Sequence, residues 1–320
     1  MDKLLGILFQ VWYTTRMRNI IKGPSVTWID IQNPQQEDIE YLEKEFDFHP
    51  LALDQLIPPS WSTKAETFPE HLFLVLFFPS YNKEKRESRP RELDVIATKN
   101  TLITSHYNSV IPLKEVFGKC NLYAEEKEKW MTRGTGYLLY HILHELWEDC
   151  NTKINRIDQK LITIEESIFK GKEREMLKEI SLVKADIINF WKIVRPQKGP
   201  ITSLRDESGA FFGPQFIPYF SSLRSHWAKV ASSLLAHKDT IEALEDTNNA
   251  LLSHKTNEIM KILTMFSVAL LPLTLLAGIF SMNTKLLPIT GMSNDFWVIS
   301  GIMAASALLT IGYFKKKKWL

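Results

Sequence analysis

The stretch ILTMFSVALLPLTLLAGIFSMNT, residues Ile262–Thr284, decides the architecture of this chain, because it contains no charged side chain. A second uncharged run, FWVISGIMAASALLTIGYF, covers Phe296–Phe314. Each run has about 19 residues or more, and at about 1.5 Å per helical residue each can cross a hydrocarbon core of about 30 Å. The alternative for one such run is a buried helix of a soluble protein. Two runs in succession, joined by a short loop with Pro, Gly and Asn, predict a transmembrane hairpin instead.

The basic residues around the two runs predict their orientation. Lys255 and Lys261 precede the first run and Lys315–Lys318 follow the second, while the loop between them carries only Lys285 and Asp295. Because Lys and Arg are enriched on the cytoplasmic side, both flanks are expected there. The sequence therefore predicts an integral protein of the cell (inner) membrane, embedded in the lipid bilayer with both termini in the cytoplasm.

Composition excludes several classes of protein. The net charge of +2 gives no support for nucleic-acid binding, which usually needs a basic excess on one face. Cys120 and Cys150 are far apart and form no CxxC pair, so reduced cytosolic thiols are expected rather than a disulfide framework. The apolar stretch Leu4–Val11 is too short to span a membrane and lacks a small-residue cleavage site, so no signal peptide is expected.

The chain before the first run divides into two blocks. From Val26 to about Phe117, the segments VTWIDI, HLFLVLFFPS, LDVIATKN and TLITSHY have the β-branched and aromatic character of strands, and an acidic helix is expected from about Pro34. This alternation predicts an α/β domain with a mixed sheet.

The second block is helical. From about Gly136 to Arg195 apolar residues recur at helical spacing, and RPQKGP is expected to end this helix. A looser segment to about Pro218 follows. No proline or glycine then occurs from Tyr219 until Pro272, so this stretch is expected to form one helix that enters the membrane directly.

These elements predict an α+β membrane protein with a cytosolic α/β domain, a long helical stalk and two C-terminal transmembrane helices. Its expected parts are a cytosolic α/β domain at 1–135, a helical stalk or funnel at 136–261, transmembrane helix 1 at 262–284, an extracytoplasmic loop at 285–295, transmembrane helix 2 at 296–314, and a basic cytoplasmic tail at 315–320.

The stretch NEIMKILTMFSVALLPLTLLAGIFSMN, Asn257–Asn283, resembles the first transmembrane helix of the CorA family of divalent-cation channels without gaps. The ending FKKKKWL is similar to the basic end of that family, and WIDIQNP with DIEYLEKEFDFHPLALDQLIPP is similar to its cytosolic domain. The resemblance covers nearly the whole chain. It implies a funnel-shaped homopentamer whose long helix continues as the pore-lining span.

The chain departs from this family at the end of the first span. Ser281-Met282-Asn283 stands where the family has Gly-Met-Asn, and Ile289 replaces the glutamate of its Met-Pro-Glu loop. Lys285 occupies a position where an acid is common. The resemblance implies that the asparagine ring holds a hydrated ion at the entrance, whereas copies of Lys285 would repel a cation by roughly a kcal/mol each in water.

One face of the first span carries side chains that favour a pore independently of the family resemblance. At about 100° per residue, seven residues fall within an arc of roughly 100° and combine oxygen-bearing with apolar side chains: Asn257, Met260, Thr264, Ser267, Leu271, Thr274 and Gly278. In a five-fold bundle the oxygens would suit the hydration shell of Mg²⁺, and the Met260 and Leu271 rings could gate by dewetting. The alternative is that Ser and Thr bond back to helix carbonyls or pack against neighbours.

Two further motifs have alternative interpretations. HILHELWED, His141–Asp149, groups possible metal ligands but is not HExxH, and residues at this spacing more often form a solvated helix face. The resemblance implies cytosolic carboxylates that sense Mg²⁺; Asp54 of LALDQL is a candidate, with a helix cap or plain surface acid as the alternative. No other metal site is assigned.

The sequence thus predicts a cation channel, most simply for Mg²⁺, with Co²⁺, Ni²⁺ or Zn²⁺ as other possible ions. The alternatives are a non-conducting member acting as a scaffold or sensor, and a channel whose ion is changed by Lys285 to a monovalent or anionic species. An enzyme is not expected, because the chain offers no nucleophile–base set and no Gly-rich phosphate loop. No cofactor is expected beyond a transported or regulatory divalent ion.

Overall fold

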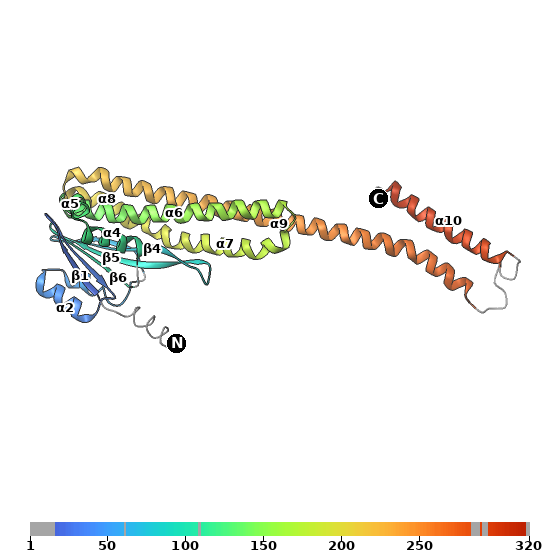
Figure 1. Ribbon diagram of the computed structural model, residues 1–320, viewed down its shortest axis with the longest axis horizontal. Helices are drawn as coiled ribbons and strands as arrows, with labels where there is room; N and C mark the ends of the chain where they lie inside the picture. The colour runs from blue at the N-terminus through green and yellow to red at the C-terminus, as the bar shows by residue number, and fades with distance from the viewer. Residues whose placement is uncertain (1–16, 61, 108–109, 283–288, 290–293, 318–320) are drawn as a thin grey trace. The chain divides into compact units, whose positions relative to one another are not determined.

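A computed structural model describes residues 17–60, 62–107, 110–282, 289 and 294–317. The chain divides into two compact units, Met1–Glu245 and Asp246–Leu320, and each is described by itself. The described part of the first unit contains a sheet and most of the helices (Figure 1). The described part of the second contains the end of one long helix and the last helix.

The first unit is built on a six-stranded sheet. Its strands are β1 (Met17–Lys22), β2 (Thr27–Gln32), β3 (Lys64–Thr67), β4 (Leu72–Asn82), β5 (Glu87–Ala97) and β6 (Thr101–His106). Their order is β1-β2-β6-β5-β4-β3, and β2 and β6 are parallel while the other neighbours are antiparallel. The predicted mixed sheet is confirmed, and β1 and β3 are strands that the sequence analysis did not identify.

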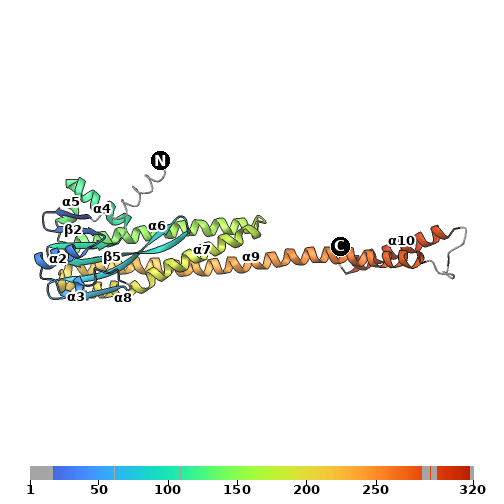
Figure 2. The same ribbon diagram turned by 90° about the horizontal axis from the view of Figure 1, so that it is seen from below.

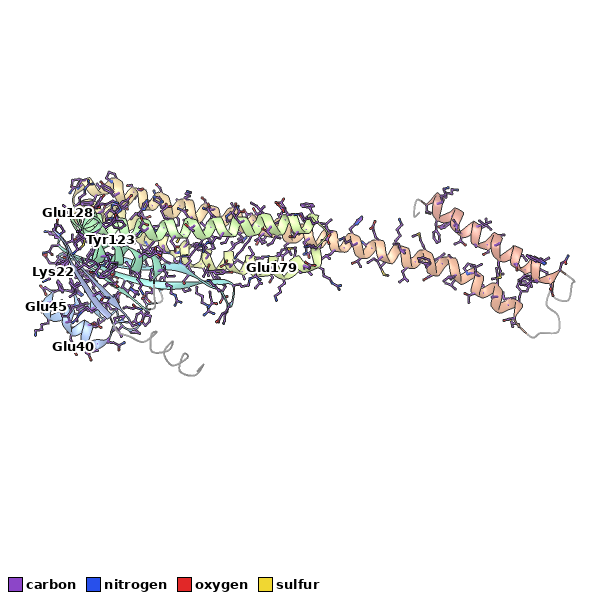
Figure 3. All side chains as sticks on the ribbon, in the orientation of Figure 1. Lys22, Glu40, Glu45, Tyr123, Glu128 and Glu179 are labelled. Atoms are coloured by element: carbon purple, nitrogen blue, oxygen red, sulfur yellow. The ribbon has the colours of Figure 1, made fainter. Side chains whose placement is uncertain are left out.

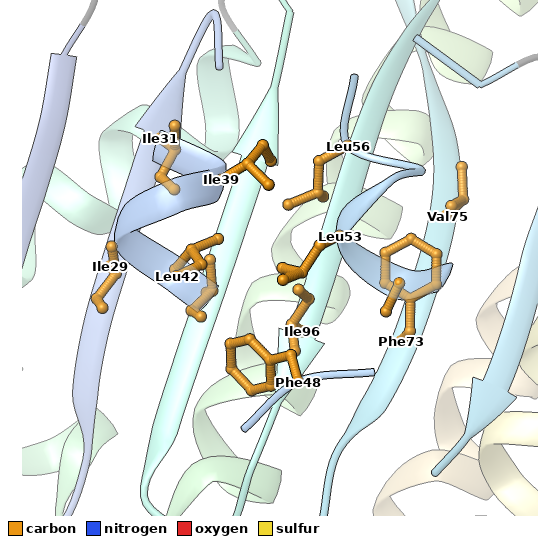
Figure 4. Packing of buried hydrophobic residues seen from close by; sticks show 12 residues of the cluster. Ile29, Ile31, Ile39, Leu42, Phe48, Leu53, Leu56, Phe73, Val75 and Ile96 are labelled. Atoms are coloured by element: carbon orange, nitrogen blue, oxygen red, sulfur yellow. The ribbon is translucent and has the colours of Figure 1, made fainter. Parts of the chain in front are cut away.

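One face of the sheet is covered by two short helices, α2 (Gln36–Glu45) and α3 (Pro50–Leu53). Ile39 and Leu42 of α2 pack with Ile29 of β2 and Phe73 of β4 in a buried apolar cluster (Figure 4). Alternate residues of each strand, Ile29 with Ile31 and Phe73 with Val75, belong to this cluster, because successive side chains of a strand point to opposite faces. The residues between them are also buried, so β2 and β4 are covered on both faces.

The helices that follow the sheet include α4 (Ile111–Leu122) and α5 (Ala124–Met131), and then the long pair α6 (Thr135–Phe169) and α7 (Glu173–Val194). The α7 helix lies against β4 and β5. Arg86 of the β4–β5 connection donates two hydrogen bonds to Glu179 of α7, labelled in Figure 3, at 2.8 and 2.5 Å. The buried Asp186 of α7 accepts bonds from the backbone N–H and the hydroxyl of Ser88, each at 2.7 Å.

The expectation of one helix from Gly136 to Arg195 is wrong, because the chain turns back between α6 and α7. Gly171 has a φ of +85° directly after the C-cap residue Lys170, and its N–H donates to the carbonyl of Ile168. A glycine in the left-handed region is a common helix stop, since it lacks the Cβ that opposes this conformation. Apolar residues continue at helical spacing on both sides of Gly171, so the sequence pattern predicted one helix across it.

The looser segment expected before Pro218 is also wrong, since most of it is helical. A 3₁₀ turn, η1 (Arg195–Gln197), leads into α8 (Lys198–Phe211), where Ile201 and Leu204 are buried. Pro196 and Pro200 lie in first turns, where a missing N–H removes no helical bond, so they begin helices rather than end one. A second 3₁₀ turn, η2 (Pro214–Phe216), follows Gly213.

The remaining helices are α9 (Ile217–Phe280) and α10 (Asp295–Lys316). Within the first unit, α6, α7 and the start of α9 lie side by side in both views (Figures 1 and 2). Trp227 of α9 donates its indole N–H to the carbonyl of Val194 of α7 at 2.9 Å. Cys120 and Cys150 are free and buried, as expected for structural thiols.

Candidate pore helix and ion entrance

The α9 helix carries every predicted pore-lining residue. It runs without interruption from Ile217 to Phe280, which confirms the single helix predicted from Tyr219 through Pro272. Its residues up to Glu245 belong to the first unit and the rest to the second. By length and composition, α10 and the C-terminal part of α9 are each able to cross a membrane.

Seven residues of α9 form the predicted pore stripe, and all of them are exposed: Asn257, Met260, Thr264, Ser267, Leu271, Thr274 and Gly278. Of these, Met260 is 55% and Leu271 67% exposed. Exposed apolar side chains at this density are unfavourable in water, so this face must be covered by lipid or by other copies of the chain.

The opposite side of α9 is partly covered. Half-buried positions recur along it at helical spacing: Met265, Ala269, Pro272, Leu273, Leu276 and Phe280. The α10 helix also has one covered face, which includes Met303, Ser306, Thr310 and the buried Phe314. The described part of the second unit consists of these two helices and short flanking pieces, so we infer that the covered faces pack together. This arrangement leaves the pore stripe facing away from α10.

The hydroxyl groups of the stripe are bonded to the helix itself. Each donates to the carbonyl four residues earlier: Thr264 to Met260 at 2.7 Å, Ser267 to Leu263 at 3.0 Å, and Thr274 to Leu270 at 3.0 Å. The alternative of back-bonding to the helix is therefore observed. It also fixes the chemistry of the stripe, because a hydroxyl that has donated its proton presents its oxygen lone pairs as acceptors.

Such acceptors suit a cation that keeps its water shell. The waters around a divalent cation turn their oxygens toward the ion, so their hydrogens point outward. Mg²⁺ in particular gives up its waters reluctantly. The acceptor oxygens of Thr264, Ser267 and Thr274 are therefore suited to accept hydrogen bonds from the waters of a hydrated cation.

Pro272 lies inside α9 on the partly covered side. It has no N–H, so the carbonyl of Val268 lacks its usual helical donor, yet the helix continues to Phe280. Membrane helices tolerate such a proline when neighbouring groups compensate for the lost bond.

The predicted ion entrance is only partly within the described residues. The helix ends at Phe280, and the N–H groups of Ser281 and Met282 donate to the carbonyls of Ala277 and Ile279 at 3.0 and 3.2 Å. Both side chains are exposed. Asn283 and Lys285 lie outside the described residues, so their predicted roles stay predictions.

Asp54, the candidate for cytosolic ion sensing, lies at the C-cap of α3. Its backbone N–H donates to the carbonyl of Pro50 at 2.9 Å, and its side chain is exposed. A sensing role for Asp54 stays a prediction, and a surface acid is also compatible with this position.

The HILHELWED segment lies on α6, and its histidines have different surroundings. His141 packs against the rings of Trp130 and Tyr137, with centroids 4.9 and 4.3 Å away. Burial lowers the pKa of His141 to about 4, so it is neutral at physiological pH. His144 and Glu148 instead meet His226 of α9. No sequence signal pointed to His226, because it is distant in the chain and part of no motif.

Comparison with known proteins identifies the family. The model of the family described as CorA-like Mg²⁺ transporter protein matches residues 24–316 of the chain. The chain belongs to this family. A protein of Thermotoga maritima named cobalt/magnesium transport protein CorA is 27% identical over 98% of this chain and 89% of its own length. A putative metal ion transporter of Bacillus subtilis, YfjQ, is 24% identical over 93% of this chain and 92% of its own.

Two solved structures have the same fold. The complete CorA magnesium transporter of Methanocaldococcus jannaschii matches with a TM-score of 0.78 and 20% identity, over 92% of each chain. The full-length CmaX protein matches with a TM-score of 0.70 and 16% identity, over 92% of this chain and 90% of its own. The predicted family and fold class are thus confirmed, and the chain is an integral membrane protein of the CorA family.

Proposed function

We propose that this chain forms a homo-oligomeric membrane channel for divalent metal cations, most simply Mg²⁺, with the α9 stripe lining its pore. The observation that carries the proposal is the position of the stripe: on a helix of a CorA-family protein, its acceptor oxygens face away from the partly covered side. Relatives named as cobalt/magnesium and magnesium transport proteins support the choice of ion. No chemical turnover is proposed.

The number of subunits belongs to the same proposal. One copy of α9 presents its stripe to open space, so a closed path needs several copies around a common axis. Five copies follow from the family resemblance. In that ring Met260 and Leu271 would form apolar constrictions between the oxygen-bearing positions, and a narrow apolar ring closes to ions when it loses water.

The orientation is proposed from the charges. Lys315 and Lys316 end α10 and Lys317 follows it; all three are exposed, while Asp295 begins the helix. Basic residues favour the cytoplasmic side, which places both termini in the cytoplasm of a cell (inner) membrane. The basic tail would also contact anionic headgroups, at about 1 kcal/mol per base near the surface.

Flux into liposomes tests the proposal. Purified full-length chain is reconstituted, and entry of Mg²⁺, Zn²⁺, Na⁺ and Cl⁻ is followed with ion-selective dyes. We expect Mg²⁺ entry, and at least a tenfold loss in Asn283→Ala. Asn294→Ala is the matched control, since this residue precedes α10 without a side-chain capping bond. Native mass spectrometry of the same sample should give five chains.

The altered signature supports a second candidate, a family member with changed selectivity or none. Lys285 stands where an acid is common in the family, and a ring of such charges opposes a divalent cation. Lys285→Gln removes the charge and should raise Mg²⁺ flux. Lys285→Glu reverses the charge and should raise the flux further. Equal flux in all three proteins would contradict the charge argument.

The non-conducting alternative, a scaffold or sensor, predicts a different outcome. Reconstituted protein would then pass none of the four ions above the rate of empty liposomes, although it still assembles. Passage of Cl⁻ or Na⁺ in preference to Mg²⁺ would instead support a changed ion.

A further inference from the structure

Three side chains with metal-binding atoms meet between two helices of the first unit. His144 and Glu148 lie four residues apart on α6, which places them on one face, and His226 faces them from α9. One ligand atom from each residue lies within 4.8 Å of the other two. The site is remote in sequence from the pore stripe, which begins at Asn257.

The contacts within this trio leave room for an ion. His226 Nδ1 lies 3.2 Å from Glu148 Oε1, and the His144 and His226 rings meet edge to face with centroids 4.9 Å apart. Two ligands of one ion can be at most about 4.2 Å apart, twice a metal–ligand bond of about 2.1 Å. Small rotations of these partly exposed side chains would bring all three atoms within that limit.

Neighbouring side chains support this set of ligands. Asn151 donates its amide N–H to Glu148 Oε1 at 3.2 Å and so orients the carboxylate, a contact of the type that supports metal ligands. Glu145 Oε1 lies 4.0 Å from His144 Nδ1 and adds negative charge beside the site.

We propose that His144, Glu148 and His226 form a binding site for a transition-metal ion of the Zn²⁺ class, including Co²⁺ and Ni²⁺. Two imidazoles and one carboxylate are a known three-ligand set for Zn²⁺, whose fourth position is filled by water. Mg²⁺ is a poor occupant, because it prefers oxygen ligands and retains its waters.

The site reaches beyond the proposed function, because it would join two helices by an ion that is not passing through the pore. His226 lies on the same continuous helix as the stripe, whereas His144 and Glu148 lie on α6. A bound ion would therefore tie the start of α9 to α6 and resist any movement that separates them.

Equilibrium binding tests the site without any flux measurement. Full-length protein in detergent, with its affinity tag removed, is titrated with Co²⁺ and followed by the visible absorption of the bound ion. Zn²⁺ binding is measured by calorimetry in excess Mg²⁺. We expect one high-affinity ion per chain and at least a tenfold loss of affinity in His144→Gln and in His226→Gln. Glu148→Gln should also bind more weakly.

His237→Gln is the matched control, because His237 is a half-buried histidine of α9 outside the trio. It should keep the wild-type affinity. The proposal is overturned if His226→Gln binds Zn²⁺ as wild type does, or if Mg²⁺ competes on equal terms. Asn283→Ala should keep the site, so failure of the channel proposal and failure of this one give separate results.

A thermal melt gives a readout that does not depend on absorbance. Zn²⁺ should raise the unfolding midpoint of the wild-type first unit, because a ligand that binds only the folded state stabilises it. The same addition should leave the midpoint of His226→Gln unchanged. An equal rise in both proteins would contradict the site.

Discussion

Large apolar side chains are buried in the first unit of this chain and exposed in the second. In the first unit, large side chains such as Trp28, Phe73 and Trp147 are less than 2% exposed. In the second, Phe266 is 65% and Leu309 is 75% exposed, and side chains stand out along both helices (Figure 3). One chain therefore completes the core of the first unit, whereas the apolar surface of the second must be covered by lipid or by other copies of the chain.

The largest expected effect contrasts the same substitution in the two units. Phe73→Ala should destabilise the first unit by about 3–5 kcal/mol, because it removes a buried ring and leaves a cavity. Phe266→Ala should leave the unfolding of that unit unchanged. Denaturant unfolding of the two full-length variants in detergent, followed by tryptophan fluorescence, makes the comparison. Equal losses would show that the two units do not unfold independently.

A buried carboxyl should make the first unit less stable as pH rises. Asp94 of β5 is 1% exposed, and its carboxyl lies beside that of Glu92. Burial, followed by the neighbouring Glu92, raises its pKa well above the usual value. Above a pH of about 3.9 the unfolded chain loses this proton while the folded one keeps it, so stability falls until the folded pKa is passed.

Asp94→Asn should therefore raise the melting midpoint at pH 8 by several degrees, and its advantage should shrink toward pH 4. Thermal melts across this range measure the effect. Asp239→Asn, which alters an exposed carboxyl of α9, should show no such trend. A variant that is less stable than wild type at pH 8 would contradict the assignment of a buried, protonated carboxyl.

Within the second unit, two adjacent leucines should differ. Leu271 belongs to the stripe, and Leu270 lies about 100° away around the helix. Leu271→Ser should raise cation flux several-fold, because a polar ring keeps its water, whereas Leu270→Ser should leave flux near wild type. Liposome flux measures both. Equal changes in the two variants would show that the stripe does not line the pore.

The smallest effect is expected at an ion pair on the surface of the first unit. Lys184 Nζ of α7 lies 2.6 Å from Glu245 Oε2 of α9, and both side chains are about one-third exposed. Glu245→Gln should cost less than about 1 kcal/mol, and the loss should shrink in high salt because the pair is screened. Unfolding at low and high salt tests this. A loss above 2 kcal/mol would mark the pair as essential to the packing of these helices.

Sequence reasoning worked best where one signal is continuous. The uncharged runs from Ile262 and Phe296 predict helices long enough to cross a membrane, and the stretch from Tyr219 onward without glycine predicts one long helix. It failed where one residue outweighs a periodic pattern. Gly171 ends α6 inside a stretch of helical spacing, and Pro200 lies in the first turn of α8 where a break was expected.

Local spacing and composition were enough to predict the two apolar spans, the mixed sheet and the stripe on α9, and the resemblance of Asn257–Asn283 to the CorA family predicted the family. Three features became visible only in the folded chain: α6 and α7 fold back on each other, Asp94 lies buried beside Glu92, and His226 meets His144 and Glu148. These features depend on which segments, distant in the sequence, pack against one another. A local sequence pattern contains no information about that packing.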